Sequence, residues 1–240
     1  ETPNYMPSAI YWSHKIVEEL AHRRKNCGAT WLGPDAKSQI TMEYNDDGTV
    51  KHIAKIVCST QHTEEYNINE ERAAVHTLIT DVIPAKLFKA DTEILINPTG
   101  RFVIGGTDGD TGLTGRKIFV DTYGGSCPHG GGAFSGKDPT KVDRSAAYMA
   151  RYLAKNIVAS GKASHATVQL AYAIGVEQPM SVYVDSDGNN YELTACITTN
   201  VDLTPKGIIN RFKLFRPIYS STTNYGHFGK LGLPWEELDL

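Results

Sequence analysis

The sequence predicts an α/β protein of the α+β type, in which small mixed or antiparallel sheets are covered by helices. Three observations carry this prediction. Amphipathic helical patterns alternate with short apolar strand patterns, a hairpin turn joins the first two strands, and two such strand-and-helix units flank a glycine-rich centre.

The first hundred residues predict a helix, a hairpin, a second helix and a short strand. We expect Ser8 to cap the first helix, because its side-chain oxygen can accept a backbone N–H, and we expect the segment 26–28 to end it. The turn 45–48 reads Asn-Asp-Asp-Gly, and an Asp-Gly pair between alternating segments is typical of hairpins. The expected elements are a helix over 8–26, strands over 37–44 and 49–59, a helix over 70–82 and a strand over 92–96.

The middle of the chain is rich in glycine between Gly100 and Gly136. One largely buried strand is expected inside it, over 116–123. After it, Asp138 and Pro139 are expected to form the N-cap and first turn of a long helix that ends at Gly161. The remaining expected elements are strands over 168–174 and 181–184, a turn over 185–188, and helices over 191–199 and 206–215.

The composition is that of a globular protein, with 40% hydrophobic and 21% charged residues. Its 240 residues suffice for one large domain or two smaller ones with a buried core. The formal net charge is -3 and no apolar run approaches the roughly 20 residues of a membrane helix, so we expect neither a nucleic-acid nor a membrane partner.

The cysteines lie far apart and form no Cys-x-x-Cys pair, which argues against a zinc knuckle and a small disulfide framework. We expect reduced, mostly buried thiols in a cytoplasmic protein. The chain starts at Glu1 and nothing there resembles a signal peptide, so we expect this start to reflect processing or the choice of the expressed segment.

The segment from Gly131 to Lys137 fits the first seven positions of a phosphate loop, G-x-x-x-x-G-K. Glycines let backbone N–H groups converge on phosphate oxygens, a lysine adds charge, and a helix N-terminus adds its dipole. The next position should be Ser or Thr to hold magnesium, and it is Asp138. We therefore favour a phosphate cradle of another kind, and a flexible surface loop remains the alternative.

Charged residues near this segment could serve the same ligand. Arg116 and Lys117 are adjacent cations on the expected buried strand, which is costly unless they pair with acids or bind an anion. Asp143 could hold a metal ion that also binds phosphates, or it could be a first-turn acid that favours the helix dipole. These alternatives stay open at the level of the residues.

Two upstream strings also carry candidate residues. Asp35 and Lys37 place an acid and a base at the start of a strand. Phe102 follows Arg101 after a turn, where an exposed ring could stack on a base, although a phenylalanine is more often in the core. The histidines show no metal-ligand spacing, and the segment that starts at Asp108 does not continue as a calcium loop.

Taken together, these strings resemble one family, methionine adenosyltransferase (S-adenosylmethionine synthetase). The resemblance covers essentially the whole chain. The matching strings are 34–39 (Pro-Asp-Ala-Lys-Ser-Gln), 97–106 (Asn-Pro-Thr-Gly-Arg-Phe-Val-Ile-Gly-Gly), 109–110, 112–117 (Gly-Leu-Thr-Gly-Arg-Lys), 120–125, 129–137, 141–148, 172–176 and 225–229.

The resemblance implies the S-adenosylmethionine synthetase fold, with repeated, similar α/β domains. Residues 1–105 would form one domain almost whole, 106–145 a remnant of the central domain with the glycine-rich triphosphate-binding segment, and 146–240 the C-terminal domain. It also implies the reaction: the methionine sulfur attacks C5′ of ATP and displaces triphosphate, which is hydrolysed to pyrophosphate and phosphate.

The resemblance further implies roles for individual residues. Lys37, Arg116, Lys117 and Lys137 would bind the triphosphate, and Lys141 would lie near methionine and the phosphates; these five form the expected catalytic set. Asp143 would be a magnesium ligand. The remaining expected ligands of the nucleotide site are Asp35, Arg101, Phe102, Asp110 (for ribose and methionine) and Ala133 (through its backbone).

The implied cofactors are Mg²⁺, two per site, and K⁺; the implied partners are ATP, L-methionine and further copies of the chain. The family forms a dimer or a dimer of dimers with sites between subunits. Its N-terminal segment, with a His-Pro-Asp motif, a potassium-binding glutamate and a mobile loop, has no counterpart here, so we expect the chain alone to be inactive. The alternatives are a non-catalytic subunit of such an assembly and a P-loop-like phosphoryl-transfer enzyme.

Overall fold

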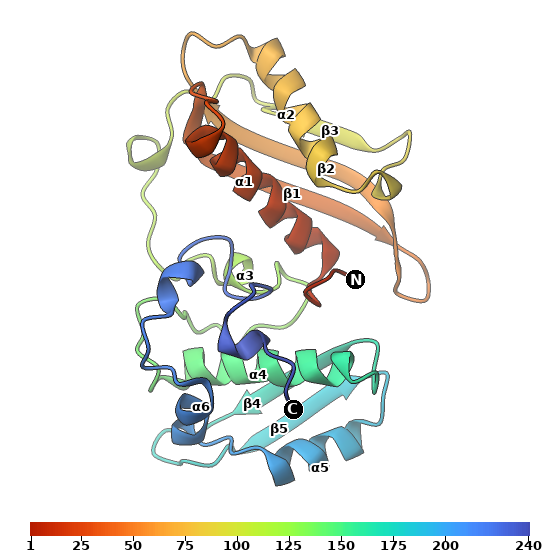
Figure 1. Ribbon diagram of the computed structural model, residues 1–240, viewed down its shortest axis with the longest axis vertical. Helices are drawn as coiled ribbons and strands as arrows, with labels where there is room; N and C mark the ends of the chain where they lie inside the picture. The colour runs from red at the N-terminus through yellow and green to blue at the C-terminus, as the bar shows by residue number, and fades with distance from the viewer. The chain divides into compact units, whose positions relative to one another are not determined.

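The computed structural model describes residues 1–240 and divides into two compact units, Glu1–Leu113 and Thr114–Leu240 (Figure 1). The division of the chain into three parts that the resemblance implies stays a prediction. None of the helices combines the length and the apolar character that crossing a membrane requires.

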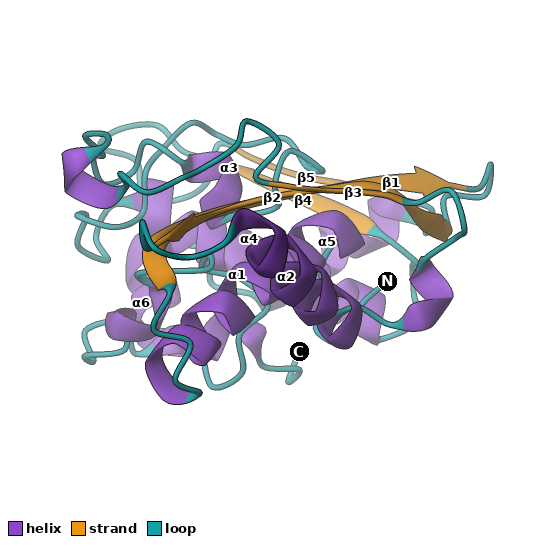
Figure 2. Cartoon of the chain, turned by 90° about the horizontal axis from the view of Figure 1, so that it is seen from above, coloured by secondary structure: helices purple, strands orange, loops and turns teal.

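The first unit consists of a three-stranded sheet with two long helices on one face (Figures 1 and 2). Strand β2 lies in the centre, antiparallel to β1 and parallel to β3. The elements are α1 (Ser8–Asn26), β1 (Leu32–Tyr44), β2 (Val50–His62), α2 (Ile68–Val82), β3 (Glu93–Ile96) and the short 3₁₀ helices η1 (Ala85–Leu87) and η2 (Gly106–Asp108).

Alternation of side chains along the strands decides which residues face the helices. Ile40 of β1 and Ile56 of β2 pair in register and are buried in the core beneath α1 and α2. Lys37 is three residues from Ile40 and therefore lies on the opposite, helix-free face, where it is exposed and pairs in register with Ser59. The same alternation that builds the core thus presents Lys37 to solvent.

The second unit consists of a hairpin and the long helix α4, which packs against it (Figure 1). The hairpin strands pair antiparallel, with Val168 opposite Val184. The elements are α3 (Ile118–Asp121), α4 (Val142–Ala159), β4 (Ala166–Ala171), β5 (Ser181–Ser186), α5 (Asn190–Asn200), α6 (Pro205–Phe212), η3 (Tyr219–Thr222) and η4 (Pro234–Glu236).

A buried ion cluster joins the C-terminal segment to α4. The Glu236 carboxylate accepts two hydrogen bonds from Arg151, at 3.0 and 2.9 Å, and one from Lys155 at 2.9 Å. It also accepts the backbone N–H of Gly229 at 2.8 Å. All three charged side chains are buried, so each depends on the others to replace the water it lost.

Most of the expected helices and strands are present, with boundaries displaced by a few residues. The turn 45–48 closes the first hairpin through a hydrogen bond from Gly48 N–H to the Asn45 carbonyl at 2.9 Å, as expected. Strand β1 begins at Leu32, earlier than the alternation indicated, because a bulge interrupts the alternation between Leu32 and Ala36.

Three expectations about local structure are wrong. Ser8 is the first residue of α1 and not its cap; its N–H donates instead to the Glu1 carboxylate at 2.8 Å. The segment 116–123 is no strand: it has no neighbouring strand to pair with and forms the single turn α3 after an exposed Arg116 and Lys117.

The third error concerns the start of α4. Asp138 does not cap this helix, which begins only at Val142, because its carboxylate accepts the Thr140 N–H at 2.8 Å and closes a separate turn. The cysteines also differ from expectation: all are free thiols, but only Cys58 is buried.

Candidate functional site

The expected site residues lie in both units, and each unit holds its own group. Asp35, Lys37, Arg101, Phe102 and Asp110 belong to the first unit. The second unit holds the others, namely Arg116, Lys117, Ala133, Lys137, Lys141 and Asp143.

In the first unit, the β1 bulge places Asp35 beside the loop that follows Phe102. The Asp35 carboxylate accepts the N–H of Gly106 at 3.0 Å, and its own N–H donates to the Gln61 side chain at 3.3 Å. Gln61 in turn donates to the Val103 carbonyl at 2.9 Å. Gln61 thus ties the bulge to the loop, a role that no sequence pattern signalled because its partners are distant along the chain.

Phe102 and Arg101 line an open pocket of about 380 Å³, together with Glu64, Val103 and Ile104. The Phe102 ring is half-buried, so it is neither a core residue nor fully exposed. Arg101 is exposed and donates to the Glu64 carbonyl. An aromatic ring and a guanidinium at one open pocket can hold a flat, electron-rich group by stacking.

A buried polar cluster beneath this pocket sets the backbone of Phe102. The Phe102 N–H donates to His62 Nε2 at 3.0 Å, which makes Nδ1 the protonated nitrogen that donates to the Thr63 carbonyl at 2.8 Å. Glu71 lies 3.5 Å from His62 and burial raises the pKa of its carboxyl. Asn97 donates to Glu71 and to the Thr60 carbonyl, so the turn before Arg101 is anchored to the core.

The other two candidates of the first unit are at its surface. Asp110 is exposed, and its carboxylate accepts the N–H of Thr111 at 2.8 Å. Lys37 is exposed and makes no ion pair in the structure. A lysine without a carboxylate partner keeps all three donors for a ligand.

In the second unit, an ion pair joins Lys137 to Asp143 at 2.7 Å across the end of the glycine-rich loop, residues 131–137. Gly132 packs directly against this pair, since a Cβ there would lie 2.5 Å from the Asp143 carboxyl carbon. A Cβ on Gly115 would likewise clash with the side chain of Ala133. The two glycines therefore bring the segment before Arg116, the loop backbone and the ion pair together.

The other three candidate cations of this unit, Arg116, Lys117 and Lys141, are exposed. Arg116 and Lys117 make no side-chain ion pair or hydrogen bond, so acidic neighbours do not neutralise them. Lys141 lies 3.4 Å from Asp138, and both side chains are more than half exposed, so solvent screens this pair strongly. Unpaired cations around a glycine-rich loop suit a polyanionic ligand.

The loop is not a P-loop. No strand leads into it, and α4 begins at Val142 and not at Lys137, so the helix N-terminus does not follow the glycines as in a Walker motif. This geometry argues against the phosphoryl-transfer alternative. The alternative that remains is a phosphate cradle of another kind, which is built from loop backbone and side-chain cations and does not use a helix N-terminus.

One carboxylate in this unit is suited to a divalent cation. No group of three or more His, Cys, Asp or Glu side chains converges anywhere in the structure. Asp143 is about half exposed, and only its Oδ2 is engaged, by Lys137. That arrangement fits Mg²⁺, which binds through one or two carboxylates and completes its shell with water and phosphate oxygens.

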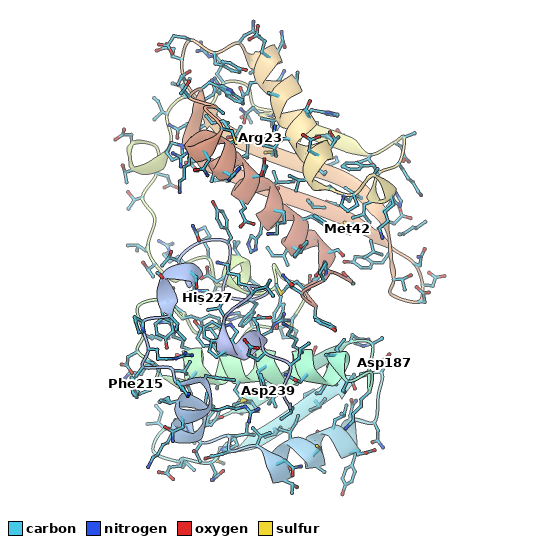
Figure 3. The ribbon with its side chains drawn as sticks, in the orientation of Figure 1. Arg23, Met42, Asp187, Phe215, His227 and Asp239 are labelled. Atoms are coloured by element: carbon cyan, nitrogen blue, oxygen red, sulfur yellow. The ribbon has the colours of Figure 1, made fainter.

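A chain of polar side chains lies beneath the glycine-rich loop, and sequence reasoning missed it. Arg144 donates to the Lys137 carbonyl at 2.7 Å and to the Tyr148 hydroxyl at 3.1 Å. Tyr148 lies 2.8 Å from Nδ1 of His227, whose Nε2 lies 3.3 Å from Ser135 Oγ. His227 comes from the C-terminal segment (Figure 3), so only tertiary contacts place it under the loop.

His227 is expected to resist protonation. Burial, followed by the charges of Arg144 and Lys230, lowers its pKa from 6.5 to about 4. The unfolded chain therefore takes up this proton at a higher pH than the folded chain does, and stability falls as the pH drops from 6.5 towards 4. We expect a loss of about 1.5 kcal/mol from His227 between about pH 6.5 and 5.

Histidine ring titration by NMR and urea unfolding at the two pH values measure this effect. A titration midpoint of His227 near 6.5, the value of an unperturbed imidazole, would contradict the prediction.

Comparison with known proteins identifies relatives along the whole chain. Residues 104–237 match the family described as S-adenosylmethionine synthetase, C-terminal domain, and residues 1–102 match its central domain. S-adenosylmethionine synthases of Rhodospirillum centenum, Sphingopyxis alaskensis and Nitratiruptor sp. are 52%, 54% and 55% identical to the chain. Each alignment covers 100% of the chain but only 64%, 63% and 64% of the respective relative, so the chain spans less than two thirds of their length.

Proposed function

The chain belongs to the S-adenosylmethionine synthetase family, and on that premise we propose that it acts in a methionine adenosyltransferase. In this reaction the sulfur of L-methionine attacks C5′ of ATP and triphosphate leaves, to be hydrolysed to pyrophosphate and phosphate. The observation that carries the proposal is the glycine-rich loop of the second unit, with its Lys137–Asp143 pair and the unpaired Arg116 and Lys117.

The reaction needs many cations, because the whole triphosphate departs and gains negative charge in the transition state. Lys37, Arg116, Lys117 and Lys137 are proposed to donate to its oxygens, which stabilises that charge as it develops. Lys137 has three N–H donors, so it can keep Asp143 as a partner and still bind phosphate. Its ion pair holds the ammonium group in place before the ligand arrives.

Asp143 is proposed to hold one of the two Mg²⁺ ions, with K⁺ as a monovalent activator. Bound Mg²⁺ supplies positive charge that neutralises the phosphates. The residues of this chain orient that carboxylate: Gly132 leaves room beside it and Lys137 holds one of its oxygens.

The adenosine end of ATP is proposed to bind at the pocket lined by Arg101 and Phe102, where the ring can stack on a base. Asp35 holds the adjoining loop through Gly106. The finer assignments are Asp110 for ribose and methionine, the backbone of Ala133 for the nucleotide, and Lys141 for methionine and the phosphates. A self-associated dimer or dimer of dimers with sites between subunits, in the cytoplasm, completes the proposal.

The position of bond cleavage tests the proposed reaction. We expect the assembled enzyme, given ATP labelled with ¹⁸O at the 5′ oxygen and L-methionine, to release the label in pyrophosphate or phosphate. Attack at C5′ breaks the bond between carbon and this oxygen, so the label must leave with the phosphates. Mass spectrometry of the products measures it.

Transfer of the terminal phosphate would leave the label in ADP instead. That outcome, or the absence of an adenosylated sulfonium product, would overturn the proposal. Omission of L-methionine is the control, because adenosyl transfer cannot proceed without the sulfur nucleophile.

A further inference from the structure

The hydrogen bonds that link Arg144, Tyr148, His227 and Ser135 beneath the glycine-rich loop all donate in the same direction, from Arg144 towards Ser135. Arg144 can only donate, so the Tyr148 oxygen accepts its N–H at 3.1 Å. Tyr148 is fully buried, and its own proton needs an acceptor, which Nδ1 of His227 provides at 2.8 Å. The opposite tautomer of His227 would leave this buried hydroxyl proton without a partner, which is costly.

The direction continues to Ser135. With Nδ1 as the acceptor, the single proton of neutral His227 lies on Nε2 and donates to Ser135 Oγ at 3.3 Å. The low pKa of His227 agrees with one ring proton at neutral pH. The Ser135 oxygen therefore accepts a hydrogen bond from His227, and its own O–H is left to donate to another acceptor. The structure contains no acceptor for this O–H.

The place of Ser135 suits an anion as that acceptor. It lies in the glycine-rich loop, two residues before Lys137, and its side chain is half-buried. The chain also begins at a cation without a carboxylate partner: Arg144 is buried, and it contacts the Lys137 carbonyl, the Tyr148 hydroxyl and, at 4.1 Å, the Tyr219 ring. A hydrogen-bond chain headed by a positive charge polarises each donor towards its far end.

We propose that Ser135 is a further binding residue of this site, which donates a hydrogen bond to an oxygen of the triphosphate. Arg144, Tyr148 and His227 are positioning residues that act through it. This inference rests on the proposed function, because it takes the polyphosphate as the ligand. Arg144 also donates to the Lys137 carbonyl. The hydrogen-bonded side chains therefore contact both Ser135 and Lys137, the two ends of the segment that is proposed to meet the phosphates.

Binding of inorganic tripolyphosphate to the 240-residue chain, measured by isothermal titration calorimetry, tests the proposal. We expect Ser135→Ala to weaken binding about tenfold, the loss of one hydrogen bond to a charged group. The matched control is Ser164→Ala, whose hydroxyl bonds Asp187 on the β4–β5 side of the unit and should leave binding unchanged (Figure 3).

A double-mutant cycle distinguishes a positioning role of Tyr148 from a purely structural one. We expect Tyr148→Phe to weaken binding in the presence of Ser135 but to add nothing in the Ser135→Ala background, because Tyr148 acts through that hydroxyl. Additive effects would mean that Tyr148 does not act through Ser135, which would overturn the proposal. If Tyr148→Phe fails to fold, as judged by circular dichroism, His227→Phe breaks the chain at the next link and takes its place in the cycle.

Nitrogen-15 NMR of His227 gives a second readout, since the proposal requires its proton on Nε2; a proton on Nδ1 would overturn it.

Lys137→Met distinguishes a failure of the role of Ser135 from a failure of the proposed function. If it weakens tripolyphosphate binding while Ser135→Ala does not, the role of Ser135 is wrong and the proposed function stands. If the unmodified chain binds no tripolyphosphate, the role of Ser135 is overturned, and the isotope experiment on the assembled enzyme decides the proposed function.

Discussion

Lys137→Met is expected to lower kcat/KM for ATP by about 100- to 1,000-fold, the effect of removing one group that stabilises developing charge. Methionine preserves the unbranched apolar stem but not the ammonium group. Its loss has two consequences, because the triphosphate loses a cation and Asp143 loses the partner that lies 2.7 Å away. The uncompensated carboxylate then repels the phosphates, unless a metal ion neutralises it.

Steady-state kinetics of S-adenosylmethionine formation by the assembled enzyme measure this effect. The matched control is Lys162→Met, which removes an exposed lysine outside the glycine-rich loop and should leave kcat/KM unchanged. A decrease smaller than about tenfold for Lys137→Met would contradict a direct role in charge stabilisation.

Glu236→Gln is expected to destabilise the second unit by about 3–5 kcal/mol, the range measured when one partner of a buried ion cluster is removed. The amide keeps the shape of the side chain but carries no charge. Arg151 and Lys155 would then remain buried without a carboxylate, and one of the contacts that bind the C-terminal segment to α4 would be weakened.

Hydrogen–deuterium exchange of the α4 amides, with those of α1 in the other unit as a reference, locates this loss, and urea unfolding gives its size. Glu237→Gln is the control, since it makes the same change at the neighbouring, exposed position. Equal effects of the two substitutions would contradict the role of the buried cluster.

The hydrophobic period identified most elements because it depends on neighbours along the chain. The α1 helix and the β1–β2 hairpin follow from repeats of apolar residues and from an Asp-Gly turn, which are local properties. The segment 116–123 misled the same reasoning, because a strand needs a partner strand and its apolar residues cannot show that none is available.

For the candidate site, the sequence indicated the glycine-rich loop, and the resemblance to one family supplied the individual ligands. The structure adds the contacts of some of them, such as Lys137 with Asp143 and Asp35 with Gly106. The roles of these residues stay proposals, which the binding and kinetic experiments test.

What the sequence determined by itself was the family, the α+β class and the cationic, glycine-rich character of the loop. These properties lie in residue types and spacing within short segments, where chain connectivity alone brings the residues together. Only the tertiary structure decided which groups support the loop: Ser135 and His227 are 92 residues apart, and Arg151 and Glu236 are 85 apart. Such pairs meet only when the C-terminal segment packs against α4, because burial removes water from their polar atoms and requires each to find a partner within the fold.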